Sequence, residues 1–422
     1  MNGLRVIENL QSLRGLTISD QPFTRRAFTA QYLMGRAWII AELEALGITP
    51  FLDVAGNLRA RLEGLSSDTI YFGSHSDTVP NGGAYDGILG VVAGLELLRI
   101  VKEQNVLLNY SLEFIDFLAE ETTDWGISCV GSRGLTGSLT ESHLLKKHPE
   151  TGETLQEAMK RMGANPNQGL PVLKTSEADA FIELHIEQGP VLERLGIDVG
   201  IVTSLVGITR LQLDVIGVSN HSGTTPMLMR QDALVAASKM IVCIHEIALE
   251  VSQKAQEKGD YFVATCGKIS NSPNAINVVP GHCEVMIDVR TSNHQYSELF
   301  ITALNQSLQT IASISSSESV EPTITFTLTE LTKTAPSQFD LDLASLCQKI
   351  ADEKSLSSLV MTSGAGHDAA FMANIMKTLM IFIPSVGGLS HNPKEESLEH
   401  DIIQGVMLFT ELILKMNRDK LL

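Results

Sequence analysis

Short apolar runs that alternate with helical patterns are the feature that most constrains the fold of this 422-residue chain. Residues 68–75, 109–121 and 179–189 have the continuous apolar character of buried strands, whereas residues 90–105 have the periodicity of a helix. The same alternation returns near the C-terminus. Strands joined by helices form parallel sheets that are covered on both faces. The sequence therefore predicts an α/β fold with a mostly parallel sheet.

The middle of the chain has a different pattern. Between residues 209 and 328 the expected elements follow the order β-α-β-β-α-β, which is typical of a ferredoxin-like α+β domain. We therefore expect a domain of residues 209–328 inserted into a larger domain that residues 1–208 and 329–422 form together. The serine-rich stretch at 315–319 is expected to be a connecting loop.

Composition and charge exclude several classes of protein. The net charge of -18 opposes binding to phosphate backbones, so no nucleic-acid partner is expected. No run of about 18 apolar residues is present, and the first residues lack the apolar core of a signal peptide. Five cysteines without paired spacing indicate a reducing compartment, the cytoplasm, and predict small buried side chains rather than disulfides.

Metal-type side chains follow the ends of the expected strands. They are His75 after the first strand, Asp86 in the glycine-rich loop behind it, Glu120 and Glu121 after the second, His185 in the third, and His391 after the last. Parallel strands end at one edge of the sheet, where open α/β sheets bind ligands. Each residue alone favours a simpler interpretation: a surface or core histidine, an Asp-Gly turn, or a solvated Glu pair.

Their combination favours a metal centre. Imidazole and carboxylate ligands without thiolates suit Zn²⁺, Mn²⁺, Co²⁺ or Ni²⁺. The set is large enough for two ions, which in such sites lie about 3.5–4 Å apart and activate a water. Asp77, two residues after His75, is expected to orient that imidazole from behind.

Six ordered motifs give the chain a resemblance to a known family. They are GSHSDTVPNGGAYDG, AEETTDWGISCVGSRGLTG, ELHIEQGPVLE, NHSGTTPMLMRQDA, PNAINVVPG and SGAGHDA. The sequence resembles the hydantoinase/carbamoylase amidohydrolases, which include N-carbamoyl-L-amino-acid hydrolases, allantoate amidohydrolases and β-ureidopropionases. These belong among the aminoacylase-type dinuclear metallohydrolases.

The resemblance implies roles for individual residues. One metal would be bound by His75, Asp86 and His185, and Asp86 would bridge to a second metal that Glu121 and His391 also bind. Glu120 would be the general base. The inserted domain would be a lid and the interface of a homodimer, from which His221 would stabilise the oxyanion in the partner's site. Substrate contacts would come from Gln188, His221, Asn277, Arg290, Gly364 and Gly366. His367 and Asp368, in the same loop as these glycines, are expected to be structural.

One segment departs from the family pattern. Many members have EEGSRF where this chain has EETTDW, so Asp124 replaces an arginine and Trp125 another aromatic residue. The expected activity is hydrolysis of an N-carbamoyl-L-amino acid to the amino acid, ammonia and carbon dioxide. Allantoate or β-ureidopropionate hydrolysis, an aminoacylase or dipeptidase, and a metal-stabilised binding protein without activity are the alternatives. An intact Glu120 argues against the last, since binding alone needs no base.

Overall fold

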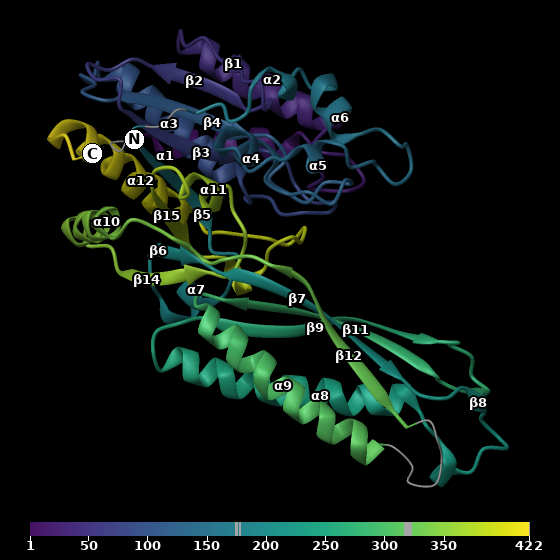
Figure 1. Cartoon of the computed structure of the whole chain (residues 1–422). Helices are drawn as coiled ribbons and strands as arrows, with labels where there is room; N and C mark the ends of the chain where they lie inside the picture. The colour runs from purple at the N-terminus through teal and green to yellow at the C-terminus, as the bar shows by residue number, and fades with distance from the viewer. Residues whose placement is uncertain (174–175, 177–178, 316–322, 422) are drawn as a thin grey trace. The chain divides into compact units, whose positions relative to one another are not determined.

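The computed structural model describes residues 1–173, 176, 179–315 and 323–421, and its internal contacts divide these residues into two compact units (Figure 1). The first unit consists of Met1–Thr203, Gln338–Met361 and Ala365–Leu422. The second consists of Ser204–Ser337 and Thr362–Gly364. Apart from Ser315, the loop expected at 315–319 lies outside the described residues.

A nine-stranded sheet forms the centre of the first unit, in the order β1-β2-β4-β3-β5-β15-β6-β13, with β14 beside β6. Its four central strands are parallel: β4 (Ser111–Phe117), β3 (Thr69–His75), β5 (Ala180–Ile186) and β15 (Lys377–Ile383). The flanking strands are β1 (Phe51–Leu52), β2 (Leu58–Leu62), β6 (Val199–Leu205), β13 (Ser337–Gln338) and β14 (Ser358–Ser363). Both β2 and β6 run antiparallel to their central neighbours. The predicted mostly parallel α/β sheet is confirmed.

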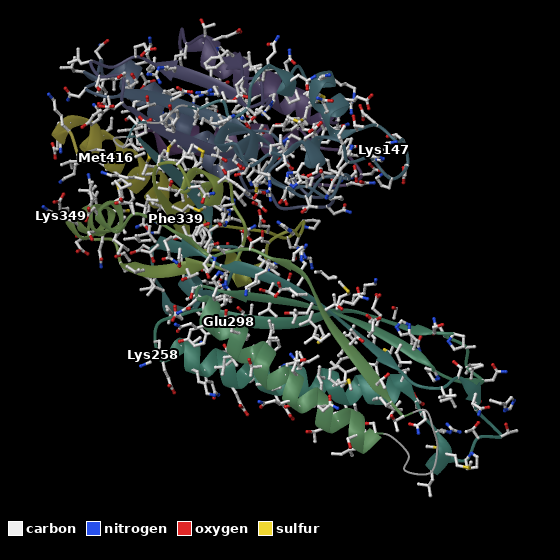
Figure 2. The ribbon with its side chains drawn as sticks, in the orientation of Figure 1. Lys147, Lys258, Glu298, Phe339, Lys349 and Met416 are labelled. Atoms are coloured by element: carbon white, nitrogen blue, oxygen red, sulfur yellow. The ribbon has the colours of Figure 1, made fainter. Side chains whose placement is uncertain are left out.

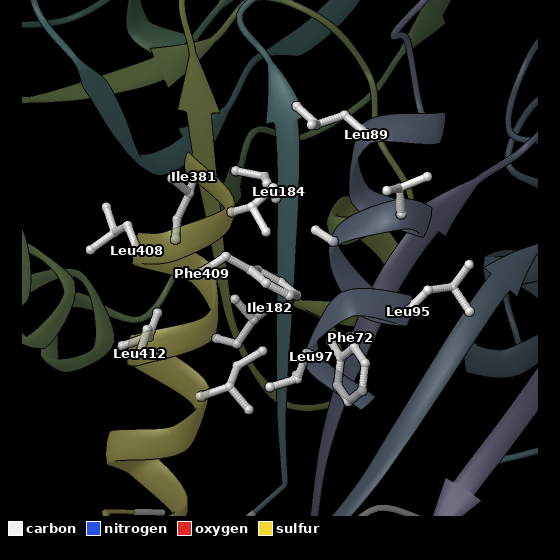
Figure 3. Close-up of a cluster of buried hydrophobic side chains, with 14 of the residues drawn as sticks. Phe72, Leu89, Leu95, Leu97, Ile182, Leu184, Ile381, Leu408, Phe409 and Leu412 are labelled. Carbon is white, nitrogen blue, oxygen red and sulfur yellow. The ribbon is translucent and has the colours of Figure 1, made fainter. Parts of the chain in front are cut away.

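Helices pack against this sheet because its strands are apolar on both faces. On one face lie α1 (Gly3–Gly15), α3 (Ile88–Glu103) and α12 (Glu399–Asp419), and α10 (Leu341–Glu353) packs against α12. Figure 3 shows Phe72, Ile182 and Ile381 from three neighbouring strands meeting Leu97 of α3 and Phe409 of α12. The rings of Phe72 and Phe409 meet edge to face with centroids 6.2 Å apart.

The remaining helices of the first unit are shorter or lie at its periphery. They are α2 (Ala30–Ala45), α4 (Val130–Thr136), α5 (Glu141–Leu144), α6 (Leu155–Arg161), α7 (Val191–Leu195) and α11 (Ala369–Met372), with 3-10 turns η1 (Pro166–Gln168) and η3 (Val386–Gly388). On α10 the side chain of Lys349 is exposed, whereas that of Met416 on α12 is buried in the core (Figure 2). Each helix buries one apolar face, and both are amphipathic.

The second unit is a four-stranded antiparallel sheet with two long helices. The sheet order is β12-β7-β11-β9, and the elements are β7 (Gly207–Ile216), α8 (Ala233–Gln256), β9 (Phe262–Ser272), β11 (His282–Thr291), α9 (His294–Ser315) and β12 (Thr325–Lys333). Every second side chain of β11 is buried, and α8 and α9 cover that face of the sheet (Figure 1). This order of elements is the predicted ferredoxin-like one.

A small two-stranded sheet belongs to the same unit. It pairs β8 (Asn220–His221) with β10 (Val278–Val279), and the 3-10 turn η2 (Met227–Met229) follows β8 in sequence. None of the described helices combines the length and the apolar character that a membrane crossing requires.

Two sequence-based expectations need correction. The second strand was expected to reach Glu121 but β4 ends at Phe117, so Glu120 and Glu121 lie in the following loop. The cysteines were all expected to be buried, yet Cys243 and Cys266 are only half-buried.

Candidate metal centre

The glycine-rich loop after β3 returns Asp86 to the end of the strand that carries His75. The return depends on Gly87, whose φ of 68° favours glycine and whose absent Cβ would lie 2.5 Å from the His75 ring. Asp86 Oδ1 consequently lies 3.6 Å from His75 Nε2. Both side chains are almost completely buried.

The two oxygens of Asp86 face two different groups of side chains. Oδ1 lies 3.1 Å from His185 Nε2, on the side of His75. Oδ2 lies 3.2 Å from His391 Nε2, which is itself 3.2 Å from Glu121 Oε1. The five side chains predicted as ligands thus form two groups of possible metal-binding atoms that share the carboxylate of Asp86. One group adds His75 and His185, and the other adds Glu121 and His391.

Backbone carbonyls orient the two buried imidazoles. Nδ1 of His75 lies 3.0 Å from the carbonyl oxygen of Asp77, and Nδ1 of His185 lies 2.9 Å from that of Ile186. If each Nδ1–H donates to its carbonyl, each ring presents the unprotonated Nε2 to Asp86. This is the tautomer that a histidine ligand requires.

The side chain of Asp77 supports the neighbouring loop as well as the histidine. Its Oδ1 lies 3.5 Å from His75 Nδ1, in the position expected from the sequence. Its two oxygens also accept the backbone N–H groups of Glu120 and Glu121, at 3.2 and 3.1 Å. One buried carboxylate therefore positions side chains from two strand ends.

Glu120 lies between His75 and a cysteine. Its Oε2 is 3.7 Å from His75 Nε2, and the Cys129 thiol donates to its Oε1 over 3.4 Å. Burial raises the pKa of Glu120 well above its usual range, and the nearby Glu121 acts in the same direction. Cys129 was expected only to fill space in the core, so its contact with Glu120 was not predicted.

The loops that carry these groups contain unusual backbone conformations. Ala119, Cys129, Gln188 and His391 have φ values of 54°, 53°, 59° and 53°, a region that non-glycine residues rarely adopt. Such conformations concentrate at functional sites because the surrounding structure must hold them. Here all four lie in loops beyond the carboxyl ends of the central parallel strands.

The charges in the cluster favour a bound cation. Burial lowers the pKa of His75, but Glu120, Asp77 and Asp86 outweigh it and hold that pKa well above its usual range. Hydrogen bonds to Asp86 and Glu121 raise the pKa of His391 to about 10. Four acidic side chains that lie close together attract positive charge: Asp77, Asp86, Glu120 and Glu121. The imidazole and carboxylate atoms of the cluster fit a divalent transition metal. The residues present therefore fit the implied metals.

The predicted substrate residue Gln188 lies beside the cluster, and so does His367, which was expected to be structural. Gln188 Nε2 donates to Asp86 Oδ2 over 3.0 Å and to Ser390 Oγ over 3.1 Å, so this amide touches the shared carboxylate directly. The ring of His367 is buried 4.6 Å from the ring of His185, and burial holds the pKa of His367 well below its usual range. Asp368 accepts a hydrogen bond from Ser132. Gly366 also belongs to the first unit.

The second unit holds the other four predicted residues, His221, Asn277, Arg290 and Gly364, in two pairs. On β8, His221 Nδ1 accepts the N–H groups of Gly223 and Thr224 at 3.1 and 3.2 Å, and the neighbouring Ser222 N–H donates to the Asn277 carbonyl. An accepting Nδ1 places the proton of a neutral imidazole on Nε2.

The second pair lies at the end of β11. Arg290 donates from Nε to Asp288 Oδ1 over 2.8 Å and from Nη1 to the Gly364 carbonyl over 2.9 Å. These two contacts fix the plane of the guanidinium group within its own unit.

The segment that departs from the family pattern forms a local ion-pair network. Asp124 pairs with Arg26 at 2.7 Å and lies 3.5 Å from His148 Nε2. The indole of Trp125 is buried against Phe28, with ring centroids 5.1 Å apart. Arg26, Asp124 and Trp125 line a small cleft together with Glu121. The acidic side chain of Asp124 is thus paired with the basic side chain of Arg26 from the N-terminal segment.

A mostly parallel α/β sheet with one carboxylate shared between a pair of histidines and a His–Glu pair at its carboxyl edge has the architecture of a metal-dependent hydrolase. Residues 71–415 match Peptidase family M20/M25/M40, and the chain belongs to this family. It is therefore a hydrolase acting on linear amide-type C–N bonds.

Named relatives narrow the class. The chain is 34% identical to an allantoate amidohydrolase of Bacillus subtilis (94% of this chain, 93% of the relative). It is 32% identical to an N-carbamoyl-L-amino-acid amidohydrolase of Paenarthrobacter aurescens (98% and 96%). The crystal structure of a hydantoinase/carbamoylase family amidase from Burkholderia multivorans aligns with a TM-score of 0.88 at 28% identity, covering 99% of this chain and 98% of that one. The resemblance to this group of amidohydrolases is confirmed.

Proposed function

We propose that this protein hydrolyses N-carbamoyl-L-amino acids with the help of two divalent metal ions. The observation that carries the proposal is the shared carboxylate of Asp86, with His75 and His185 beside one oxygen and His391 beside the other. A carboxylate placed in this way suits a bridge between two ions. Zn²⁺, Mn²⁺, Co²⁺ and Ni²⁺ all match the donor atoms.

Bound ions would supply Lewis acidity at the scissile carbonyl and lower the pKa of the attacking water. Glu120 takes the proton of that water. Its raised pKa suits a base that keeps this proton and then delivers it to the leaving nitrogen. The N-carbamoyl C–N bond breaks, and the released carbamate decays to ammonia and carbon dioxide.

Groups from both units recognise the substrate. The fixed fork of Arg290 binds the α-carboxylate, because a planar guanidinium matches a carboxylate better than an ammonium does. Gln188 and Asn277 add amide hydrogen bonds, and the backbone at Gly364 and Gly366 permits close approach of the substrate.

The oxyanion is stabilised by the partner subunit's His221 in a homodimer that forms through the inserted domain, residues 209–328. The two N–H groups that Nδ1 accepts keep the imidazole in the tautomer with a proton on Nε2. His221 is exposed, so this N–H is available as a donor. Oxyanion donors act mainly on the transition state.

A substrate panel tests the proposal. Ammonia release is measured from N-carbamoyl-L-amino acids, allantoate and β-ureidopropionate, and amino-acid release from an N-acyl amino acid and a dipeptide, with chelated and metal-restored enzyme. We expect metal-dependent turnover that is fastest on N-carbamoyl-L-amino acids. Allantoate amidohydrolysis is the second candidate, because the chain is 34% identical to an enzyme of that name. Full activity in the chelated enzyme would refute the metal mechanism.

Mixed dimers test the role of His221. One subunit carries His221→Ala and the other Glu120→Gln, and each homodimer should be nearly inactive, since the loss of one oxyanion donor costs about 10²–10³ in kcat. In the mixed dimer one site has an intact Glu120 and receives an intact His221 from the other subunit. Activity should recover to about half of wild type. Inactive mixed dimers formed from metal-loaded subunits would place His221 in its own site or outside the reaction.

A further inference from the structure

A buried carboxylate that no sequence pattern indicated joins the two loops that carry Asp86 and His391. Glu395 is 4% exposed. Its Oε1 accepts the backbone N–H groups of Tyr85 and Asp86, at 2.8 and 3.0 Å. Its Oε2 accepts the hydroxyl of Ser390 at 2.8 Å. The two loops lie about 300 positions apart in sequence and meet at this side chain.

The Asp86 loop is shaped to receive this carboxylate. A Cβ atom at Gly83 would lie 1.9 Å from Glu395 Oε2 and 2.0 Å from Oε1, so any larger residue there would displace the side chain. The glycine and the glutamate therefore form a matched pair.

The contacts continue from Glu395 to the side chain of Asp86. Ser390 Oγ, which donates to Glu395, also accepts the Gln188 amide at 3.1 Å, and that amide donates to Asp86 Oδ2 at 3.0 Å. Glu395 thus holds the backbone of Asp86 directly and its carboxylate through two intermediates. His391, immediately after Ser390, is held with a φ of 53° in the same loop.

We infer that Glu395 is a positioning residue that locks the Asp86 loop to the His391 loop and thereby sets the metal affinity of the site. The inference rests on the proposed function, since it assumes that Asp86 and His391 bind metal. Without Glu395, two buried N–H groups lose their acceptor and the loops are free to separate. The contact with Glu395 then no longer holds Asp86 Oδ2 and His391 Nε2 at their separation of 3.2 Å.

The test is a metal titration of the chelator-stripped full-length protein, followed by calorimetry and by the visible absorption of Co²⁺. Glu395→Ala should weaken metal binding about 10- to 100-fold, the usual effect of removing a group that supports ligands. Glu395→Gln should retain most of the affinity, because one amide oxygen still accepts both N–H groups and the Ser390 hydroxyl can turn to accept the amide. Gly83→Ala should reproduce the loss without changing Glu395.

The control is Asp53→Ala. Asp53 is also buried and its Oδ1 accepts two backbone N–H groups, those of Ala55 and Asn57, but it touches none of the proposed ligands. It should lower the melting temperature and leave metal affinity unchanged. A purely structural role for Glu395 would give the same result for Glu395→Ala, and that outcome would overturn the inference.

Two further outcomes remain decisive. If Glu395→Ala does not fold, Ser390→Ala replaces it and should cost at least about 2- to 10-fold in affinity, the worth of its hydrogen bond to Glu395, because it also removes one acceptor of the Gln188 amide. Wild-type affinity in both Ser390→Ala and Gly83→Ala would then refute the lock. A wild-type protein that binds no divalent metal would instead refute the proposed function itself, and so the two failures are distinguishable.

Discussion

Replacing Asp77 is the most informative perturbation of the site, because this side chain touches no substrate in the proposed mechanism and yet holds two strand ends. Asp77→Ala removes the acceptor of the Glu120 and Glu121 N–H groups and the carboxylate 3.5 Å from His75 Nδ1. An unsatisfied buried N–H costs about 1–3 kcal/mol. Two of them cost about 2–6 kcal/mol of unfolding free energy. We expect a loss in the lower half of this range because Glu121 is only partly buried.

The effect on the metals is a separate quantity. Loss of a supporting carboxylate typically lowers metal affinity about 10- to 100-fold. Asp77→Asn keeps one oxygen and can accept only one of the two N–H groups, so it should fall between wild type and Asp77→Ala. Urea unfolding of the stripped protein measures the first quantity, and calorimetric titration with Zn²⁺ or Mn²⁺ measures the second.

Asp179→Ala is the matched control for this prediction. Asp179 is buried and accepts the N–H groups of Thr69 and Ser176, both at 2.8 Å. It lies at the N-terminal ends of β3 and β5, whereas the candidate metal centre lies at their C-terminal ends. It should lose comparable stability and keep full metal affinity. Equal metal affinities of Asp77→Ala and Asp179→Ala would show that Asp77 supports the fold alone, and the reasoning would fail.

Three other predictions concern the chemistry of the site. Glu120→Gln should retain both metals and an unchanged KM but lose turnover, whereas Glu121→Gln should release the second metal first. Metal analysis with steady-state kinetics distinguishes the two variants, and reversed phenotypes would mean that the two roles are exchanged. Because its neighbours raise the pKa of His391 to about 10, the metal-free protein keeps that imidazole protonated at neutral pH, so metal affinity should rise by up to about tenfold per pH unit for the one proton displaced. Titrations at pH 6, 7 and 8 in buffers of different ionisation enthalpy measure this, and an affinity independent of pH would contradict it. Asp124→Asn releases Arg26 from its ion pair. The ratio of kcat/KM for N-carbamoyl-aspartate to that for N-carbamoyl-alanine should rise about 2- to 5-fold, the free energy of an exposed ion pair. An unchanged ratio would mean that the cleft lined by Arg26 and Asp124 does not contribute to specificity.

The central strands could be predicted from the sequence because burial on both faces leaves a continuous apolar run. The expected strand at 68–75 agrees with β3 to within one residue at its start, and that at 179–189 contains β5. The two-residue strands β1, β8, β10 and β13 are too short to produce any periodicity, so no sequence pattern indicates them. The helix α1 was also missed, although Asn2 caps its first turn.

The candidate ligands were found for a related reason. His75 and His185 lie at strand ends that a parallel sheet must bring to one edge, so their residue types alone suggested a shared site. Glu395 and Cys129 gave no such signal. A carboxylate that accepts backbone N–H groups from a loop about 300 positions away has no sequence pattern, because any residue has a backbone N–H to offer.

The distribution of these residues between the units has a consequence for specificity. Every proposed metal ligand and Glu120 belong to the first unit, whereas His221, Asn277 and Arg290 belong to the second. The contacts that orient each group lie within its own unit, as Asp288 orients Arg290 and Asp77 orients Glu120. Apart from Gln188, whose amide contacts Asp86 in the first unit, the proposed metal ligands and the substrate-binding side chains therefore depend on separate sets of supporting contacts. Under the proposed function, substitutions in the second unit should change the substrate preference and leave the metal chemistry of the first unit unchanged.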